Sequence, residues 1–240
     1  MPAVRFPDLH PWELTPQEAV AVQANLADRI VLRDTLPDRV RLVAGVDVSY
    51  QRRAERFHGA VVLIDLTTAA IVETAVASAD GRFPYVPGLL SFRELPVLLQ
   101  AFRTLRVLPE VVLVDGQGIA HPRRFGLASH LWLWIGLPTI GCAKSRLCGE
   151  AAEPGPLRGE KTPLLLDGQP VGAVLRTKDR VKPMFISPGH LVSAERAIDI
   201  VLRCGGGYRL PEPTRQAHLA SNRLRREDEL LRHNPLVTDP

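Results

Sequence analysis

The chain has 240 residues and a mass of 26.4 kDa, enough to bury a substantial core without disulfides or a structural metal. With 45% hydrophobic and 23% charged residues, the composition excludes disordered, fibrous and membrane-spanning proteins, since the longest charge-free apolar run, residues 131–143, is too short to cross a bilayer. The net charge of +4 is compatible with an acidic partner but does not require one. The N-terminus lacks a signal-peptide core and the three cysteines lack CxxC or CxxH spacing. We therefore expect a cytoplasmic protein with no membrane partner, no disulfide framework and no zinc site.

The first third of the chain predicts a helix followed by an antiparallel meander. Thr15, Pro16 and Glu18 are the residue types expected at an N-cap, a first helical position and a capping box. They predict a helix over residues 15–34 that ends before Pro37. Three strand-like segments follow, over residues 41–50, 57–66 and 70–77, joined by short turns.

The rest of the chain predicts alternating helices and strands. We expect helices over residues 91–105, with Ser91 as the cap, and over residues 122–135, 193–204 and 213–232. We expect strands over residues 111–114 and 139–143, a surface loop over 150–161, and a hairpin of strands 171–176 and 184–187. The order indicates a single α/β domain over residues 1–240, with its core at about 41–204. Its mixed central sheet would combine a three-strand antiparallel meander with parallel strands, flanked by helices.

Two aspartates interrupt or end apolar strands. Asp47 lies inside the apolar segment 42–48, where an unpaired carboxylate is costly to bury, and Asp115 ends the buried run that starts at residue 111. If these strands are parallel neighbours, the carboxylates converge at the edge where α/β sheets bind ligands, and their repulsion calls for a cation such as Mg²⁺. Either aspartate alone is more simply a turn or capping residue. Together with Glu94, which opens the next helix, they favour a metal site.

The segment between Asp115 and Glu150 contains no acidic residue. Its basic residues include Arg123, Arg124, Lys144 and Arg146. Arginines at the start of the predicted helix add to the positive end of its dipole and favour a phosphate. Lys144, just after a predicted strand, is placed to contact a phosphate or stabilise a transition state. The alternatives are a solvated helix start and a surface lysine at a strand end.

Several long motifs then point to one known family. They are GVDVSY at 45–50, FPYVPGLLSFRE at 83–94, VDGQGIAHPRRFGLASHLW at 114–132, GCAKSRL at 141–147, SPGHLVSAERAIDIVL at 187–202 and LPEPTRQAHLAS at 210–221. Over roughly residues 11–225 the chain closely resembles endonuclease V, the deoxyinosine-directed repair nuclease. The resemblance implies an RNase H-like fold. It also implies hydrolysis of the second phosphodiester bond on the 3′ side of hypoxanthine in DNA, with Mg²⁺ as cofactor and Mn²⁺ as a substitute.

The same resemblance assigns catalytic roles to individual residues. It implies that Asp47, Glu94, Asp115, Lys144 and His218 form the catalytic set. We expect Asp47 and Asp115 to bind the metal directly and Glu94 to bind it or to orient water. Lys144 would be the active-site cation, and His218 would position water or serve a second site. A histidine near a chain end is otherwise more often an exposed surface residue.

The resemblance also implies residues that bind DNA. Pro84, Tyr85, Val86 and Pro87 would form a stiff wedge that enters the base stack, with His121 and Arg123 contacting the DNA. The pocket for the base would be lined by Gly88, Leu90, Gly116, Gly118, Gly126 and Leu147, whose glycines let backbone groups approach a base edge. A tyrosine packed on the core and glycines that serve turns are the alternatives.

One position departs from the usual family pattern. Gln117 stands where many relatives have His or Asn, and we expect it to tune substrate contacts without abolishing activity.

Three functions remain open. The leading hypothesis is a monomeric Mg²⁺-dependent nuclease acting on deoxyinosine in DNA. The alternatives are a relative acting on inosine in RNA or on flap or branched DNA, and a binding module that has lost catalysis. The presence of all three predicted carboxylates argues against the last.

Overall fold

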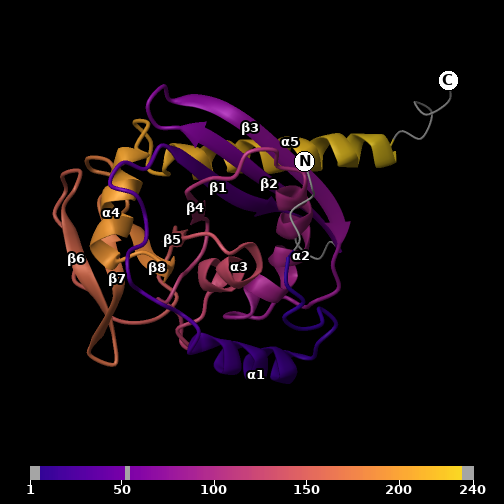
Figure 1. Cartoon of the computed structure of the whole chain (residues 1–240), viewed down its shortest axis with the longest axis horizontal. Coiled ribbons are helices and arrows are strands. Elements are labelled where there is room, and N and C mark those ends of the chain that lie inside the picture. The colour runs from indigo at the N-terminus through magenta and orange to yellow at the C-terminus, as the bar shows by residue number, and fades with distance from the viewer. Residues whose placement is uncertain (1–5, 52–54, 234–240) are drawn as a thin grey trace.

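The computed structural model describes residues 6–51 and 55–233 and contains one mixed sheet with helices on both faces (Figure 1). The strands are β1 (Leu42–Ser49), β2 (Arg56–Asp65), β3 (Ala70–Asp80), β4 (Val111–Val114), β5 (Thr139–Ala143), β6 (Lys161–Leu166), β7 (Gln169–Leu175) and β8 (Met184–His190). The helices are α1 (Pro16–Ala27), α2 (Leu90–Arg103), α3 (Leu127–Ile135), α4 (Ala194–Arg203) and α5 (Glu212–His233). In the described part of the chain, no helix is both long enough and apolar enough to span a membrane.

The sheet has the strand order β3-β2-β1-β4-β5-β8-β7-β6. The first three strands form the predicted antiparallel meander, and β1, β4 and β5 run parallel. The second half, β8-β7-β6, is antiparallel. The expected fold class, an antiparallel meander joined to parallel strands and flanked by helices, is therefore confirmed.

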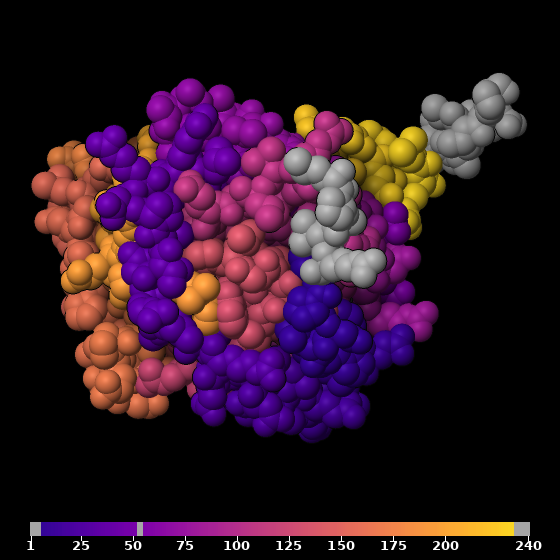
Figure 2. All heavy atoms as spheres, in the orientation of Figure 1, coloured from indigo at the N-terminus to yellow at the C-terminus, as the bar shows by residue number. Residues whose placement is uncertain are grey.

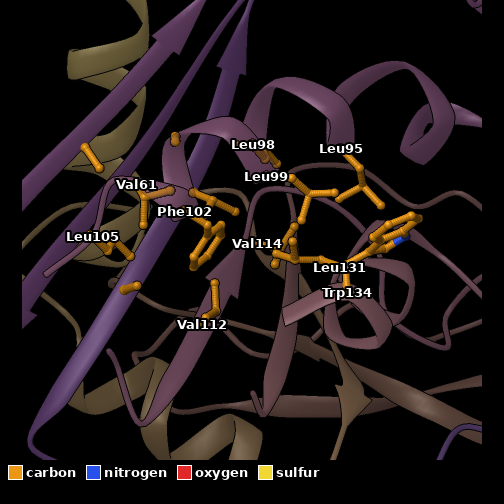
Figure 3. Close-up of a cluster of buried hydrophobic side chains, with 14 of the residues drawn as sticks. Val61, Leu95, Leu98, Leu99, Phe102, Leu105, Val112, Val114, Leu131 and Trp134 are labelled. Carbon is orange, nitrogen blue, oxygen red and sulfur yellow. The ribbon is translucent and has the colours of Figure 1, made fainter. Parts of the chain in front are cut away.

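Alternating residues of the central strands bury two separate cores. On one face α2 and α3 pack on β1 and β4, and Figure 3 shows Leu99 and Phe102 of α2 directed at Val112 and Val114 of β4. On the other face, α4 covers Val43 of β1 and Leu113 of β4. On this face, Ala217 of α5 packs against the buried residues of β2. Because side chains alternate along a strand, each central strand contributes to both layers.

The first helix is shorter than predicted. It begins at the expected capping box, but it ends at Ala27 instead of residue 34. Beyond it, the backbone N–H of Val31 donates to Nδ1 of His190 at 3.0 Å, and that of Thr35 donates to the carbonyl of Leu191 at 3.2 Å. These bonds to the end of β8 replace helical ones. Figure 2 shows the segment as a violet band crossing the face of the molecule above α1.

One further prediction was wrong, and one strand was not predicted. Helix α3 starts at Leu127 instead of residue 122, because Arg124 has a left-handed backbone (φ 52°) and Gly126 N–H donates to the carbonyl of Gly118 at 2.9 Å. Strand β6 was missed, although Asp167 and Gly168, both with positive φ, form the tight turn that joins it to β7. The loop over 150–161 is as predicted except at its ends, where Glu150 forms a bridge with Leu165 and Lys161 begins β6. The antiparallel pairing of the last two strands is as predicted.

Candidate active site

Asp47 and Asp115 lie side by side at the carboxyl ends of neighbouring parallel strands. The last residue pair of the β1–β4 register is Val46 with Val114, so the two aspartates are the next residue on each strand. The N–H of Asp115 donates to the carbonyl of Val46 at 3.4 Å, which continues the ladder to this point. The convergence expected from the sequence is confirmed by this register.

Glu94 reaches the same place from α2. The helix begins at Leu90 after Leu89, with no side-chain cap, so the predicted capping role of Ser91 is wrong. Ser91 instead lies in the first turn and shares a hydrogen bond of 2.9 Å with Nδ1 of the buried His130. This contact ties the start of α2 to α3 and fixes the turn from which Glu94, only 7% exposed, projects.

The three acids repel one another in a desolvated setting. Burial raises the pKa of Glu94 well above its usual range, and the charges of Asp47 and Asp115 raise it further, while a hydrogen bond from Tyr50 opposes the rise. Burial also raises the pKa of Asp115; the ion pair with Lys144 opposes this, and contact with Asp47 adds to it. At Glu94 and Asp115, burial and mutual repulsion therefore outweigh the opposing charges of Arg93 and Lys144.

The donor set suits a hard divalent cation. All three acids line one cavity of about 210 Å³, together with Lys144 and His218. Among the residues that the structure describes, no three His, Cys, Asp or Glu side chains already sit at the spacing of a complete metal cage. Mg²⁺ does not need one, because it typically takes one or two carboxylates and completes its shell with water and substrate phosphate. The adjacent Asp47 and Asp115 provide that pair.

Helix α5 closes the other side of the acidic cavity. The Ser221 hydroxyl donates to Oδ2 of Asp47, and Nδ1 of His218 lies 3.4 Å from the same oxygen. Hydrogen bonding to Asp47 raises the pKa of His218. Asn222 donates to the carbonyl of His218 at 2.7 Å. Sequence reasoning missed Ser221 and Asn222, although positions three and four after a candidate histidine share its helix face.

Gly45 allows the start of α5 to pack closely against β1. It lies two residues before Asp47, on the same face of β1, and a Cβ built there would be 2.0 Å from the backbone carbon of Pro213 and 2.3 Å from the nitrogen of Thr214. Only glycine lets the start of α5 rest on the strand at this distance. The glycine of the GVDVSY motif thereby sets the position of His218 over Asp47.

Lys144 is held in place by its backbone as well as by its charge. It follows β5, and its Nζ makes an ion pair with Asp115. A terminal nitrogen of Arg209 donates to the carbonyl of Lys144 at 2.6 Å and to that of Pro183 at 2.8 Å. Arg209 gave no signal in the sequence because it lies in an irregular segment after the triple glycine 205–207.

A second cavity, of about 310 Å³, adjoins the acidic one. Its lining includes Tyr85, Val86, Pro87, Gly88, Leu90, Gly116, Gly126 and Leu147 from the predicted wedge and base pocket. Asp115, Leu127 and Lys144 line both cavities and form the wall between them. Tyr85 is 66% exposed, so the alternative of a tyrosine packed on the core does not hold.

Two residues predicted for the base pocket and the wedge do not line the second cavity. Gly118 does not line the second cavity; a Cβ there would meet the carbonyl oxygen of Pro188 at 2.0 Å, so this glycine serves close packing on β8. Pro84 lines a separate cavity together with Phe83 and Arg93.

His121 and Arg123 do not begin a helix, and their side chains hold the wedge loop. Nε2 of His121 lies 2.8 Å from the carbonyl oxygen of Gly88, and Arg123 donates to the same oxygen at 3.0 Å. Arg123 also donates to Oε1 of Gln23 at 2.6 Å, which brings α1 into the support. Burial lowers the pKa of His121 to about 4 and keeps it neutral. Their DNA contacts remain a prediction.

Gln117 links the loops that carry Asp115 and Lys144. Its Nε2 donates to the carbonyl of Ser145 at 3.0 Å, and the residue is buried in the lining of the second cavity. It therefore spans from the turn after β4 to the turn after β5. Its effect on substrate choice stays a prediction.

Known proteins with similar sequences form a consistent group. A model of the Endonuclease V family matches residues 24–219. Endonuclease V of Gloeobacter violaceus is 48% identical over 231 residues, which cover 95% of this chain and 94% of that protein. Endonuclease V of Azotobacter vinelandii is 49% identical over 224 residues, 93% of this chain and all of that protein (100%).

Solved structures agree. The crystal structure of Endonuclease V from Streptomyces avermitilis matches with a TM-score of 0.86 at 42% identity, covering 95% of this chain and 100% of that one. Endonuclease V of Ciona intestinalis, in complex with a 24-mer DNA containing an inosine followed by a ribo-adenosine, matches with a TM-score of 0.76 at 27% identity, covering 88% and 98%. The mixed sheet and its helices are the RNase H-like nuclease fold, and the chain belongs to the endonuclease V family.

Proposed function

We propose that this nuclease recognises deoxyinosine in DNA and hydrolyses the second phosphodiester bond on its 3′ side, with Mg²⁺ as cofactor and Mn²⁺ as a substitute. One observation carries the proposal: a cavity large enough for a base shares the wall formed by Asp115, Leu127 and Lys144 with the acidic cavity. We expect a nucleotide whose base enters the first cavity to have its 3′ phosphates directed toward the second. The Ciona relative bound to inosine-containing DNA supports the choice of ligand.

Backbone groups around the first cavity suit hypoxanthine. This base lacks the 2-amino group of guanine and has a carbonyl where adenine has an amine. Gly88, Gly116 and Gly126 line the cavity with bare backbone, so no side chain at these positions keeps a base edge at a distance. A tight pocket of this kind rejects guanine by bulk and adenine by mismatched hydrogen bonds, since an unpaired buried polar group costs about 1–3 kcal/mol.

The exposed Tyr85 is suited to opening the base stack. It stands between two prolines, which restrict the backbone and keep its ring projecting from the rim of the cavity. His121 and Arg123 brace this loop through Gly88. Unstacking a base costs a few kcal/mol, and less at a mispaired site, so a rigid wedge favours damaged positions.

Residues around the acidic cavity have distinct tasks in hydrolysis. Asp47 and Asp115 would hold the cation, and Glu94 would hold it or accept a proton from water. When bound, Mg²⁺ supplies an activated nucleophile and offsets charge on the phosphate. Lys144 contacts the phosphate oxygens, and His218, kept near Asp47, orients water or protonates the departing oxygen. One chain supplies every part, in keeping with a monomer.

The test compares related substrates under matched conditions. The purified protein is incubated with oligonucleotides carrying deoxyinosine, with inosine-containing RNA, with a flap and with undamaged DNA, in Mg²⁺ or EDTA, and each cut is mapped. We expect a Mg²⁺-dependent nick only on deoxyinosine DNA, lost in Asp115→Asn. Asp65→Asn is the matched control, because Asp65 is a buried strand-end aspartate paired with Arg41 outside the site.

Other outcomes have clear meanings. Stronger cleavage of the RNA or the flap than of deoxyinosine DNA would replace the proposed substrate with one of those. Binding of deoxyinosine DNA without any cut in Mg²⁺ or Mn²⁺ would identify a binding module and sink the nuclease assignment.

A further inference from the structure

Two exposed aromatic rings flank Lys144. Among the aromatic side chains in the described residues, only Tyr85 at 66% and Tyr208 at 53% are more than half exposed. Tyr85 lines the base-sized cavity, whereas Tyr208 lines a different cavity of about 320 Å³ just before α5. Lys144 is the one residue that this cavity shares with either of the two described above. Its full lining is Lys144, Tyr208, Arg209, Leu210 and Arg215.

The Tyr208 ring is held in position although it fills no core. The guanidinium of Arg215 lies 4.3 Å from the ring centroid and is fixed by two hydrogen bonds to Glu212, of 2.7 and 2.6 Å. Arg209, the residue after Tyr208, anchors the loop by donating to the carbonyls of Lys144 and Pro183. The carbonyl of Arg209 itself accepts a hydrogen bond from the Thr177 hydroxyl at 2.6 Å. An exposed aromatic in a fixed orientation is a low-entropy binding surface.

The chemistry of this cavity favours a nucleobase over a phosphate. Arg215 is paired with Glu212, Lys144 is paired with Asp115, and Arg209 directs one terminal nitrogen to two carbonyls, so part of the donor capacity of each cation is already used. What the cavity offers is an aromatic face beside the aliphatic side chain of Leu210. Proteins that follow a single strand use such faces for stacking, which tolerates any base because every base has a π-face.

We propose that Tyr208 forms a stacking site for the base immediately 3′ of the bond that is cut, a site that rests on the proposed function. The deoxyinosine base lies on the Tyr85 side of Lys144, and the scissile phosphate lies at the acids. Tyr208 belongs to the loop between α4 and α5, and its cavity meets the acidic cavity at Lys144. The strand thus crosses Lys144 between two aromatic contacts, and the second contact holds the 3′ product end.

The test is a double-mutant cycle on binding, in which the Tyr208 ring and the DNA base on the 3′ side of the cut are removed separately and together. Dissociation constants are measured in EDTA for wild type and Tyr208→Ala on a single-stranded deoxyinosine oligonucleotide with a normal or an abasic nucleotide just 3′ of the cut position. We expect Tyr208→Ala to weaken binding of the normal strand about fivefold or more, the fold-change of one base–aromatic stack. On the abasic strand the same variant should bind like wild type.

Controls separate stacking from general effects. Tyr208→Phe should bind normally, because it keeps the ring. Leu108→Ala should also bind normally, because Leu108 is 50% exposed but lies before β4, at the opposite end of the strands from the site. Equal weakening of normal and abasic strands by Tyr208→Ala, or coupling to the nucleotide on the 5′ side of the cut, would overturn the proposal. The Mg²⁺-dependent nick of wild type reports the proposed function separately.

Discussion

Gly45→Ala tests whether close contact between β1 and α5 builds the active site. The new methyl carbon would lie 2.0 and 2.2 Å from the backbone carbon and oxygen of Pro213 and 2.3 Å from the nitrogen of Thr214. These atoms are main chain, so no side-chain rotation relieves the clash. A contact of at least about 3.4 Å requires α5 to retreat from the strand by roughly 1 Å or more.

Such a retreat has two consequences. Overpacking of this kind costs about 1–3 kcal/mol of unfolding free energy, because the contacts of Ala217 and Ala220 with β2 open as the helix moves. The same shift carries His218 and Ser221 away from Asp47, and a misplacement of about 1 Å can reduce a rate by roughly 100-fold. We therefore expect activity to fall much further than stability.

Urea unfolding and the nicking rate on deoxyinosine DNA, measured on the same preparation, check this expectation. Gly59→Ala is the control: its Cβ would meet atoms of Val97 at 3.2–3.3 Å, on the α2 side, where a shift of a few tenths of an ångström suffices. Gly45→Ala with wild-type nicking would refute the argument that this glycine positions α5.

Two further predictions concern hydrogen bonds at the edges of the site. Because burial lowers the pKa of His121 from 6.5 to about 4, the unfolded chain binds the extra proton first as pH falls, so unfolding free energy should drop below pH 6.5, by about 2 kcal/mol at pH 5. Urea titrations should show this pH-dependent part missing in His121→Asn, and an unchanged pH dependence would contradict it. Ser221→Ala removes a donor to Asp47 and should raise the Mg²⁺ concentration needed for half-maximal nicking about 10-fold, with substrate KM little changed; an unaltered Mg²⁺ requirement would show that Ser221 does not orient Asp47.

Features decided by neighbouring residues could be predicted from the sequence. The capping box of Thr15 and Glu18 forms as expected. The pairing of Asp47 with Asp115 followed from two apolar runs that suited adjacent parallel strands. The capping box depends only on residues close together in the sequence. The aspartate pair depends on two strands whose complete burial makes them neighbours in the centre of the sheet.

Features decided by distant partners could not be predicted. The end of α1 depends on bonds to His190 and Leu191, far along the chain. The late start of α3 depends on Gly126 folding back onto Gly118. Arg209 acts on the Lys144 backbone from an irregular loop that has no periodicity to read. Strand β6 is different, because its Asp-Gly turn is a local signal for a hairpin.

We expect one cavity to hold the lesion base while the acids beside it cut at a fixed step along the strand. The most direct measurement moves a single deoxyinosine through successive positions of one duplex and maps the Mg²⁺-dependent nick at nucleotide resolution. The shared wall of Asp115 and Lys144 predicts that the nick follows the lesion one for one, always at the second bond on its 3′ side. A nick that stays in place, or that falls at a variable distance from the lesion, would contradict the account.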